Sequence, residues 1–287
     1  MHVRMRRLAA LLAIVAISAL ASACSRDTVT KRADLLARYA QYYAPPAGGR
    51  APLVILMSGC GGLAGDSGPN RVMNNYGEAA AKGGAYAVIV DSFQPRGINR
   101  EKAIRSVCSG IRLRGGERAG DILAGELLAR RRWGDRFSGI VLAGWSHGAW
   151  TVMELLSDEP DARRVGTLRI DGPPPAALRP DAVVLYYPYC GLLNRSARRP
   201  KWAFDGPLVL VTAELDSMGA EQKCLPIVQR NMRDPTAIRH VDAKGLTHAF
   251  DEEMQSADSK FVYSPTATAR SEQGFSDFIA QQAARLR

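Results

Sequence analysis

The chain has 287 residues, 46% of them hydrophobic, and carries a formal net charge of +10 at pH 7. Its basic residues are scattered, as in Arg130–Arg132 and Arg198–Arg199, with no aromatic residues interleaved, which disfavours a nucleic-acid partner and indicates a solvated basic surface. Such a surface suits anionic envelope components or acidic substrates. The chain has no CxxC pair and no HExxH motif, so neither a metal site nor a cofactor is predicted.

The first 23 residues have the three parts of an export signal. Three arginines within residues 1–7 precede an almost wholly apolar stretch over 8–20, and small residues fill 21–23. The stretch is shorter than the ~20 residues that a membrane span requires, and no later run is longer. We therefore predict a signal peptide over 1–23, whose removal lowers the formal charge to +7.

Cys24 follows the signal directly, in a setting that resembles a bacterial lipoprotein signal. The residue three places before it is Ala21, where a large aliphatic residue is usual. Two outcomes stay open, lipidation of Cys24 and ordinary cleavage after Ala23, and the sequence favours lipidation. Either places the protein in the periplasm or cell envelope. Residues 24–49 are polar, end in Pro and Gly, and are expected to form a tether or lead-in.

Four further cysteines remain after Cys24. An even number in an oxidising compartment predicts two disulfides, and the count alone leaves all three pairings open. These residues are Cys60, Cys108, Cys190 and Cys224.

Residues 50–287 alternate short apolar runs with helical patterns and contain no internal repeat. This alternation predicts one α/β domain with a mostly parallel central sheet and helices on both faces. Strands are expected over 52–57, 85–90, 137–143, 182–187, 208–212 and 238–241, and helices over 70–82, 117–133, 220–232 and 268–286, with another beginning near Ala149. Residues 163–180 are expected to be an irregular excursion.

The most informative motif is Gly144-Trp145-Ser146-His147-Gly148, between an expected strand and an expected helix. The G-x-S-x-G spacing in that setting is typical of a nucleophile elbow, in which a sharp turn exposes the serine hydroxyl. Ser146 is therefore the predicted nucleophile.

A serine nucleophile needs a histidine base and a carboxylate that orients it. His2 leaves with the signal, His147 begins a helix facing away from Ser146, and His240 lies within a strand, which leaves His248 in the loop after the last strand. The acid should lie between serine and histidine along the chain. Asp216, just past a strand, is favoured over Glu214.

The oxyanion formed on attack needs two donors. The backbone N–H of His147 is one candidate, because it follows the nucleophile. The Gly-rich stretch 58–62 follows an early strand, and the N–H of Cys60 there is the second.

The motifs together resemble the dienelactone hydrolase family of α/β-hydrolases, from about residue 52 to the C-terminus. The resemblance rests on six stretches, namely 58–62, 91–97, 144–148, 187–190, 214–216 and 247–250. The chain departs from the family by having Ser58 where a histidine is common, and Ser146 where the name-giving enzymes use cysteine. The second departure indicates general ester hydrolysis rather than a dienelactone substrate.

The resemblance also implies a disulfide pairing and a function. The strand order of the fold implies Cys60–Cys108 and Cys190–Cys224, clamping loops around the site. Arg96 is a candidate for binding a substrate carboxylate, with pairing to a structural acid as the equal alternative, and Trp145 is a second candidate substrate contact. We predict a serine hydrolase acting on a small-molecule carboxylic ester through Ser146, His248 and Asp216, with a lipid anchor as its membrane contact. Two alternatives are a serine peptidase of the same fold and a catalytically silent envelope binding protein.

Overall fold

The structure is a computed structural model and describes residues 27–65, 68–69, 71–198, 201–253 and 259–287. The predicted signal peptide and Cys24 lie outside the described residues. Across the part that is described, no helix combines the length and apolarity needed to cross a bilayer.

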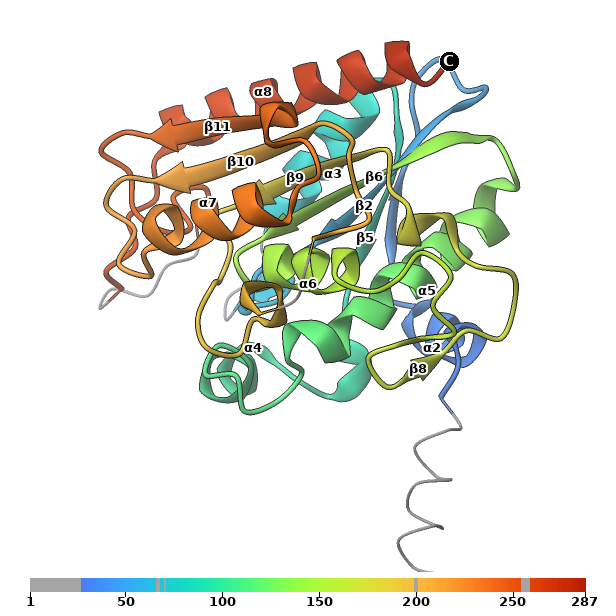
Figure 1. Ribbon diagram of the computed structural model, residues 1–287, viewed down its shortest axis with the longest axis horizontal. Helices are drawn as coiled ribbons and strands as arrows, with labels where there is room; N and C mark the ends of the chain where they lie inside the picture. The colour runs from blue at the N-terminus through green and yellow to red at the C-terminus, as the bar shows by residue number, and fades with distance from the viewer. Residues whose placement is uncertain (1–26, 66–67, 70, 199–200, 254–258) are drawn as a thin grey trace, which may run out of the picture.

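A seven-stranded sheet forms the centre of the molecule (Figure 1), in the order β1-β5-β2-β6-β9-β10-β11. Every neighbouring pair is parallel except β1 with β5. The expected mostly parallel sheet is therefore confirmed. The strands are β1 (Gln41–Tyr43), β2 (Ala51–Met57), β5 (Tyr86–Val90), β6 (Phe137–Trp145), β9 (Ala182–Tyr186), β10 (Leu208–Ala213) and β11 (Ile238–Ala243).

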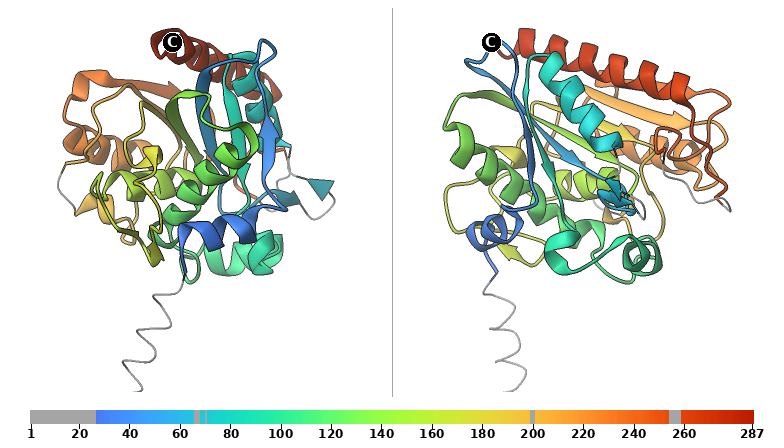
Figure 2. Two further views of the ribbon diagram at one scale, coloured as in Figure 1. Left: turned by 90° about the vertical axis from the view of Figure 1, so that its right-hand side faces the viewer. Right: turned by 180° about the vertical axis from the view of Figure 1, so that it is seen from behind.

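Helices cover both faces of this sheet, as Figure 2 shows from two sides. The apolar side chains of β2, β5 and β9 are buried on both faces, which explains why these strands read as continuous apolar runs. One core contains α2 (Val29–Leu36), α5 (Gly115–Trp133), α6 (His147–Leu156) and part of α7 (Ala220–Asn231). The core on the other face contains α3 (Val72–Lys82) and α8 (Pro265–Arg285).

Short elements fill the connections between the main ones. They are β3 (Ala64–Gly65), β4 (Gly68–Pro69), η1 (Gln94–Arg96), α4 (Arg100–Lys102), η2 (Ala103–Val107), β7 (Arg164–Val165), β8 (Leu168–Arg169), η3 (Ala176–Leu178), η4 (Arg195–Ala197) and η5 (Pro235–Ala237). The excursion expected over 163–180 thus contains the β7–β8 hairpin and η3.

The expected tether over residues 24–49 is wrong for its described part. Thr28 caps α2 by accepting a hydrogen bond from the Lys31 N–H at 3.3 Å, and the helix buries Val29, Ala33 and Leu36. β1 then pairs with β5 as an antiparallel edge strand. The helix was missed because it has eight residues and places Arg32 on its buried face, which breaks the apolar pattern.

Candidate active site

The predicted nucleophile stands at the carboxyl end of β6, on the turn into α6. Ser146 has φ +49° and ψ −108°, a strained conformation for a residue with a side chain. The two motif glycines make this turn possible. A Cβ on Gly148 would lie 1.9 Å from the Met57 carbonyl oxygen, and a Cβ on Gly144 would lie 2.5 Å from the Gly148 backbone. The tight elbow expected from the motif is therefore present.

The structure brings the three predicted catalytic side chains into one hydrogen-bonded relay. His248 Nε2 lies 2.9 Å from Ser146 Oγ, and His248 Nδ1 lies 2.9 Å from Asp216 Oδ2. A carboxylate only accepts, so Nδ1 carries the proton and donates it to Asp216, and Nε2 is left to accept from the serine hydroxyl. The side chains of His248 and Asp216 are only 5% and 1% exposed, which shields the relay from water.

The rejected candidates have other contacts. His240 Nε2 lies 2.8 Å from Thr212 Oγ1, between neighbouring strands. Glu214 is exposed and accepts from the Gly245 N–H at 2.9 Å, so it helps to hold the loop that leads to His248. The other oxygen of Asp216 accepts from the Met218 N–H at 2.7 Å, which fixes the carboxylate toward the histidine.

A cleft of about 690 Å³ opens at the relay. Ser146, His248, Cys60 and His147 all line it. Much of its wall is apolar or aromatic, contributed by Ile104, Trp150, Tyr189, Met218 and Phe261.

Solved structures share this architecture. A dienelactone hydrolase-like promiscuous phosphotriesterase from metagenomic libraries superposes with a TM-score of 0.59 at 14% identity, over 84% of this chain and 91% of its own. A putative dienelactone hydrolase from Klebsiella pneumoniae gives 0.55 at 14%, over 84% and 98%. The chain has the α/β-hydrolase fold.

An esterase from Thermogutta terrifontis, solved with butyrate bound, is also similar, with a TM-score of 0.56 at 13% identity over 85% of this chain and 88% of its own. No family model matches the chain, and no curated protein does. At such identities the likeness establishes the fold alone, and the chemistry of the site has to be argued from its residues.

The loop after β2 lies directly against the hydrolase elbow. A Cβ on Gly59 would be 3.7 Å from Ser146 Cβ, so this loop passes within van der Waals distance of Ser146. His147 is the first residue of α6, and the first N–H groups of a helix have no partner within it. The backbone of residues 58–62 and the start of α6 thus face the same space beside Ser146.

A buried arginine, which the sequence analysis missed, forms hydrogen bonds to the loop after β2. Arg118 is fully buried and donates to the Ser58 carbonyl oxygen at 2.7 Å and to the Ser92 hydroxyl at 2.9 Å. Its guanidinium also lies 3.3 Å from His147 Nδ1. Burial and the Arg118 charge hold the pKa of His147 well below its usual range, so the ring stays neutral and accepts. Arg118 therefore ties the loop after β2 to the start of α6.

A buried carboxylate lies on the other side of the relay. Asp251, three residues after His248, is 2% exposed and accepts from Tyr76 Oη at 2.8 Å, from Trp145 Nε1 at 3.2 Å, and from Tyr187 Oη. The Tyr187 ring packs 4.7 Å from that of His248. Asp251 thus connects the loop that carries His248 to Trp145, the residue before Ser146.

Asp251 should make stability depend on pH. Burial, which outweighs the hydrogen bonds from Tyr187 and Tyr76, raises the pKa of Asp251 to about 6. An unfolded aspartate titrates near 3.9, so this group favours the fold most below that pH and loses the contribution as pH rises through about 6. We expect the free energy of unfolding of the wild type, relative to Asp251→Asn, to fall by roughly 2 kcal/mol between pH 4 and pH 7.

Urea unfolding at both pH values measures this difference. Asp135→Asn is the matched control, because the Asp135 side chain is 92% exposed and should give no such change. Parallel pH dependence in the wild type and Asp251→Asn would show that Asp251 keeps an ordinary pKa.

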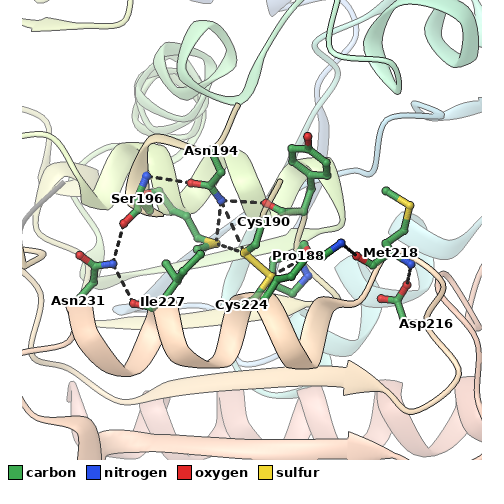
Figure 3. The surroundings of a disulfide bond; sticks show 12 residues. Pro188, Cys190, Asn194, Ser196, Asp216, Met218, Cys224, Ile227 and Asn231 are labelled. Atoms are coloured by element: carbon green, nitrogen blue, oxygen red, sulfur yellow. Dashed lines mark hydrogen bonds between the residues drawn. A yellow bond between two sulfur atoms is a disulfide. The ribbon is translucent and has the colours of Figure 1, made fainter. Parts of the chain in front are cut away.

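The structure contains two disulfides, in the pairing that the family resemblance implies. Cys60 is bonded to Cys108, and both line the cleft. Cys190 is bonded to Cys224, which joins the loop after β9 to α7 (Figure 3). Figure 3 also shows Asp216 and Met218 on the connection that leads into α7. The second bond therefore restrains the segments that carry Tyr189 and Asp216.

We expect non-reducing peptide mapping of the exported protein to find these two pairs. They enclose 48 and 34 residues, so the chain-entropy model gives ~3–4 kcal/mol of stabilisation for each. The Cys190→Ser/Cys224→Ser variant should lose stability of that order in urea unfolding. Four free thiols in protein purified from the envelope would contradict the prediction.

Neither candidate substrate contact lies in the large cleft. Arg96 donates to Asp121 Oδ1 at 2.8 Å and to the Ser92 carbonyl oxygen at 2.6 Å. Arg96 is therefore paired with a structural acid, which was the alternative to binding a substrate carboxylate. Asp121 also binds Arg32 at 2.6 Å. Trp145 is 2% exposed and stacks on Tyr186 with ring centroids 4.8 Å apart. It is a core residue beneath the elbow.

Proposed function

We propose that the protein is an exported serine hydrolase that cleaves carboxylic esters through an acyl-enzyme. The observation that carries this proposal is the Ser146–His248–Asp216 relay, with both contacts at 2.9 Å, whose Ser146 and His248 line an open cleft. Structural neighbours that are described as esterases, one of them solved with butyrate, support it.

In the proposed reaction His248 Nε2 takes the proton from Ser146 Oγ as the oxygen attacks the ester carbonyl. Asp216 holds the ring and stabilises the imidazolium that forms. When the tetrahedral intermediate collapses, the C–O bond to the alcohol breaks and His248 returns the proton to the leaving oxygen. Water then attacks the acyl-serine by the same route, which releases the acid and restores Ser146.

The negative charge of the tetrahedral intermediate would be held by the backbone N–H groups of Cys60 and His147. Both residues line the cleft beside Ser146, and preorganised amides of this kind are worth ~3–4 kcal/mol each in related chemistry. The contacts of Arg118 with Ser58 and His147 favour a fixed separation between these two donors.

The wall of the cleft favours an apolar acyl or alkyl group. Its large side chains are mainly apolar or aromatic, and its buried edge carries the Arg100–Glu252 ion pair at 3.1 Å. Because Arg100 is paired and Arg96 is bound to Asp121, neither supplies an unopposed charge for a substrate carboxylate. This supports general ester hydrolysis over a dienelactone substrate.

Labelling by a fluorophosphonate probe, followed by hydrolysis of p-nitrophenyl esters from acetate to octanoate, tests the proposal. We expect stoichiometric labelling at Ser146 and turnover that rises with chain length until the cleft is filled. A protein that neither reacts with the probe nor turns over any ester would be a silent hydrolase-fold protein.

We also propose that Cys24 is the lipidated N-terminus of the mature protein, because it follows the small residues 21–23 at the signal boundary. A single acyl chain binds a bilayer only marginally, so stable attachment takes the several chains of a mature lipoprotein. Intact-mass analysis of the membrane fraction should find an N-acyl, diacylglyceryl Cys24. A periplasmic form with unmodified Cys24, and unchanged fractionation of Cys24→Ala, would leave a simple secreted hydrolase.

A further inference from the structure

Exposed apolar side chains are concentrated around the mouth of the cleft. In the described ranges seven large hydrophobic side chains are exposed, and six of them lie on segments that form or adjoin this mouth. The six are Ile104, Ile111, Leu192, Leu215, Met218 and Val262, which are 37% to 82% exposed. The seventh, Leu35, is on α2, no residue of which lines the cleft. Single exposed hydrophobics are ordinary, but six on the segments next to one opening indicate a surface that is covered in use.

Two of the six line the cleft itself, and the other four lie on segments next to it. Ile104 and Met218 are lining residues. Ile111 follows the lining residue Gly110, and Leu193 packs so closely on Gly110 that a Cβ there would lie 2.4 Å from it, which brings the Leu192 loop to the same place.

Val262 and Leu215 lie on segments next to the two ends of the His248–Asp216 contact. Val262 follows the lining residue Phe261, and its N–H donates to Thr247 Oγ1 at 2.7 Å, beside His248. Leu215 precedes Asp216, and its N–H donates to the Leu246 carbonyl oxygen at 2.9 Å. The six exposed side chains therefore lie on segments that line the cleft or adjoin its lining residues.

The charges on these segments are mainly positive. Within residues 99–114, 189–198, 214–223 and the described parts of 246–262, seven exposed residues are cationic and three are anionic. The cations are Lys102, Arg105, Arg112, Arg114, Arg198, Lys223 and Lys260, and the anions are Glu101, Glu214 and Glu253. Apolar side chains interspersed with Lys and Arg fit an anionic lipid surface, where the apolar groups enter the headgroup layer and the cations remain at the phosphates.

We propose that these six apolar side chains and seven cations form a lipid-docking rim, which seats the mouth of the cleft on an anionic bilayer. This inference rests on the proposed ester hydrolysis. When the rim is docked, the cleft opens onto the lipid layer, so the rim selects esters that partition into lipid. Soluble esters would reach Ser146 without the rim.

Vesicle co-sedimentation of the mature exported chain tests the rim. Every protein would carry Cys24→Ala so that no acyl chain contributes to binding. The test variant is Ile111→Ser/Leu192→Ser, whose residues do not line the cleft, and the matched control is Leu35→Ser. We expect the parent and the control to bind phosphatidylglycerol vesicles and the test variant to bind about tenfold or more weakly. Phosphatidylcholine vesicles should bind the parent weakly.

The catalytic readout separates the rim from the proposed function. Activity on p-nitrophenyl acetate should be equal in all three proteins, whereas hydrolysis of a long-chain ester held in phosphatidylglycerol vesicles should fall in the test variant alone. Equal vesicle binding by the three proteins would overturn the rim, as would a concentration-dependent dimer that the test variant loses, which would assign the surface to a second copy. Vesicle binding without turnover of any ester would instead refute the esterase and leave the rim in place.

Discussion

Ser146→Ala should abolish ester hydrolysis while leaving the protein folded. The hydroxyl is the atom that His248 Nε2 contacts at 2.9 Å, and alanine removes it without adding bulk to the elbow. Loss of a triad nucleophile lowers kcat by roughly a millionfold in a well-studied serine protease, because the remaining groups have nothing to activate. The free energy of unfolding should change by less than about 1 kcal/mol, since the backbone turn is unchanged.

Turnover of p-nitrophenyl butyrate by wild type and Ser146→Ala, with urea unfolding of both, measures the two halves of this expectation. Fluorophosphonate labelling should disappear in parallel. A variant that kept more than about a tenth of the wild-type rate would show that another residue attacks the ester.

The second large effect is expected at the acid, where the chain offers a matched pair two residues apart. Asp216→Asn should lower kcat by about a thousandfold to ten-thousandfold, because an amide in place of the carboxylate favours the wrong histidine tautomer and withdraws the charge that stabilises the imidazolium. Glu214→Gln should change kcat little, because its carboxylate contacts the Gly245 N–H and Lys244 rather than the ring.

The same contrast can be made for the base. His248→Ala should be as damaging as Asp216→Asn, whereas His240→Ala should remove only the contact with Thr212 between strands. Steady-state kinetics of the four variants decide the assignment. The assignment of base and acid would be wrong if Glu214→Gln or His240→Ala caused the large loss of kcat.

The sheet and the relay could be predicted because the strands and the serine have local sequence patterns, and because few residues are candidates for the base and the acid. Each buried parallel strand is a short apolar run that stands out between helical patterns, and the G-x-S-x-G spacing needs only five neighbouring residues. His248 could be chosen because only four histidines exist, and Asp216 because chain order restricts the acid. The contacts at 2.9 Å that join them span 102 and 32 residues, yet the motif, the small number of histidines and the chain order together were enough to predict which residues meet.

The supporting residues could not be predicted, because their roles come from partners far along the chain. Arg96 is bound to Asp121 on α5, which is also bound to Arg32 of α2, a helix too short to show its period. Asp251 accepts from Tyr76, 175 residues away. For Arg118 the one available signal was an arginine on the apolar face of a predicted helix, one turn before Ile122. A charged side chain at such a position is retained only with buried partners, which the structure supplies.

Cys60 combines two features that bear on when this protein becomes active. Its backbone N–H is the proposed oxyanion donor, and its sulfur is bonded to Cys108. Disulfides of this kind form in oxidising compartments, whereas cysteine thiols are kept reduced in the cytosol. A newly made chain that has not been exported therefore lacks the Cys60–Cys108 bond that holds the loop after β2. If the proposed activity and export hold, full competence would arrive with export rather than with synthesis, and the protein would not act on esters inside the cell that makes it.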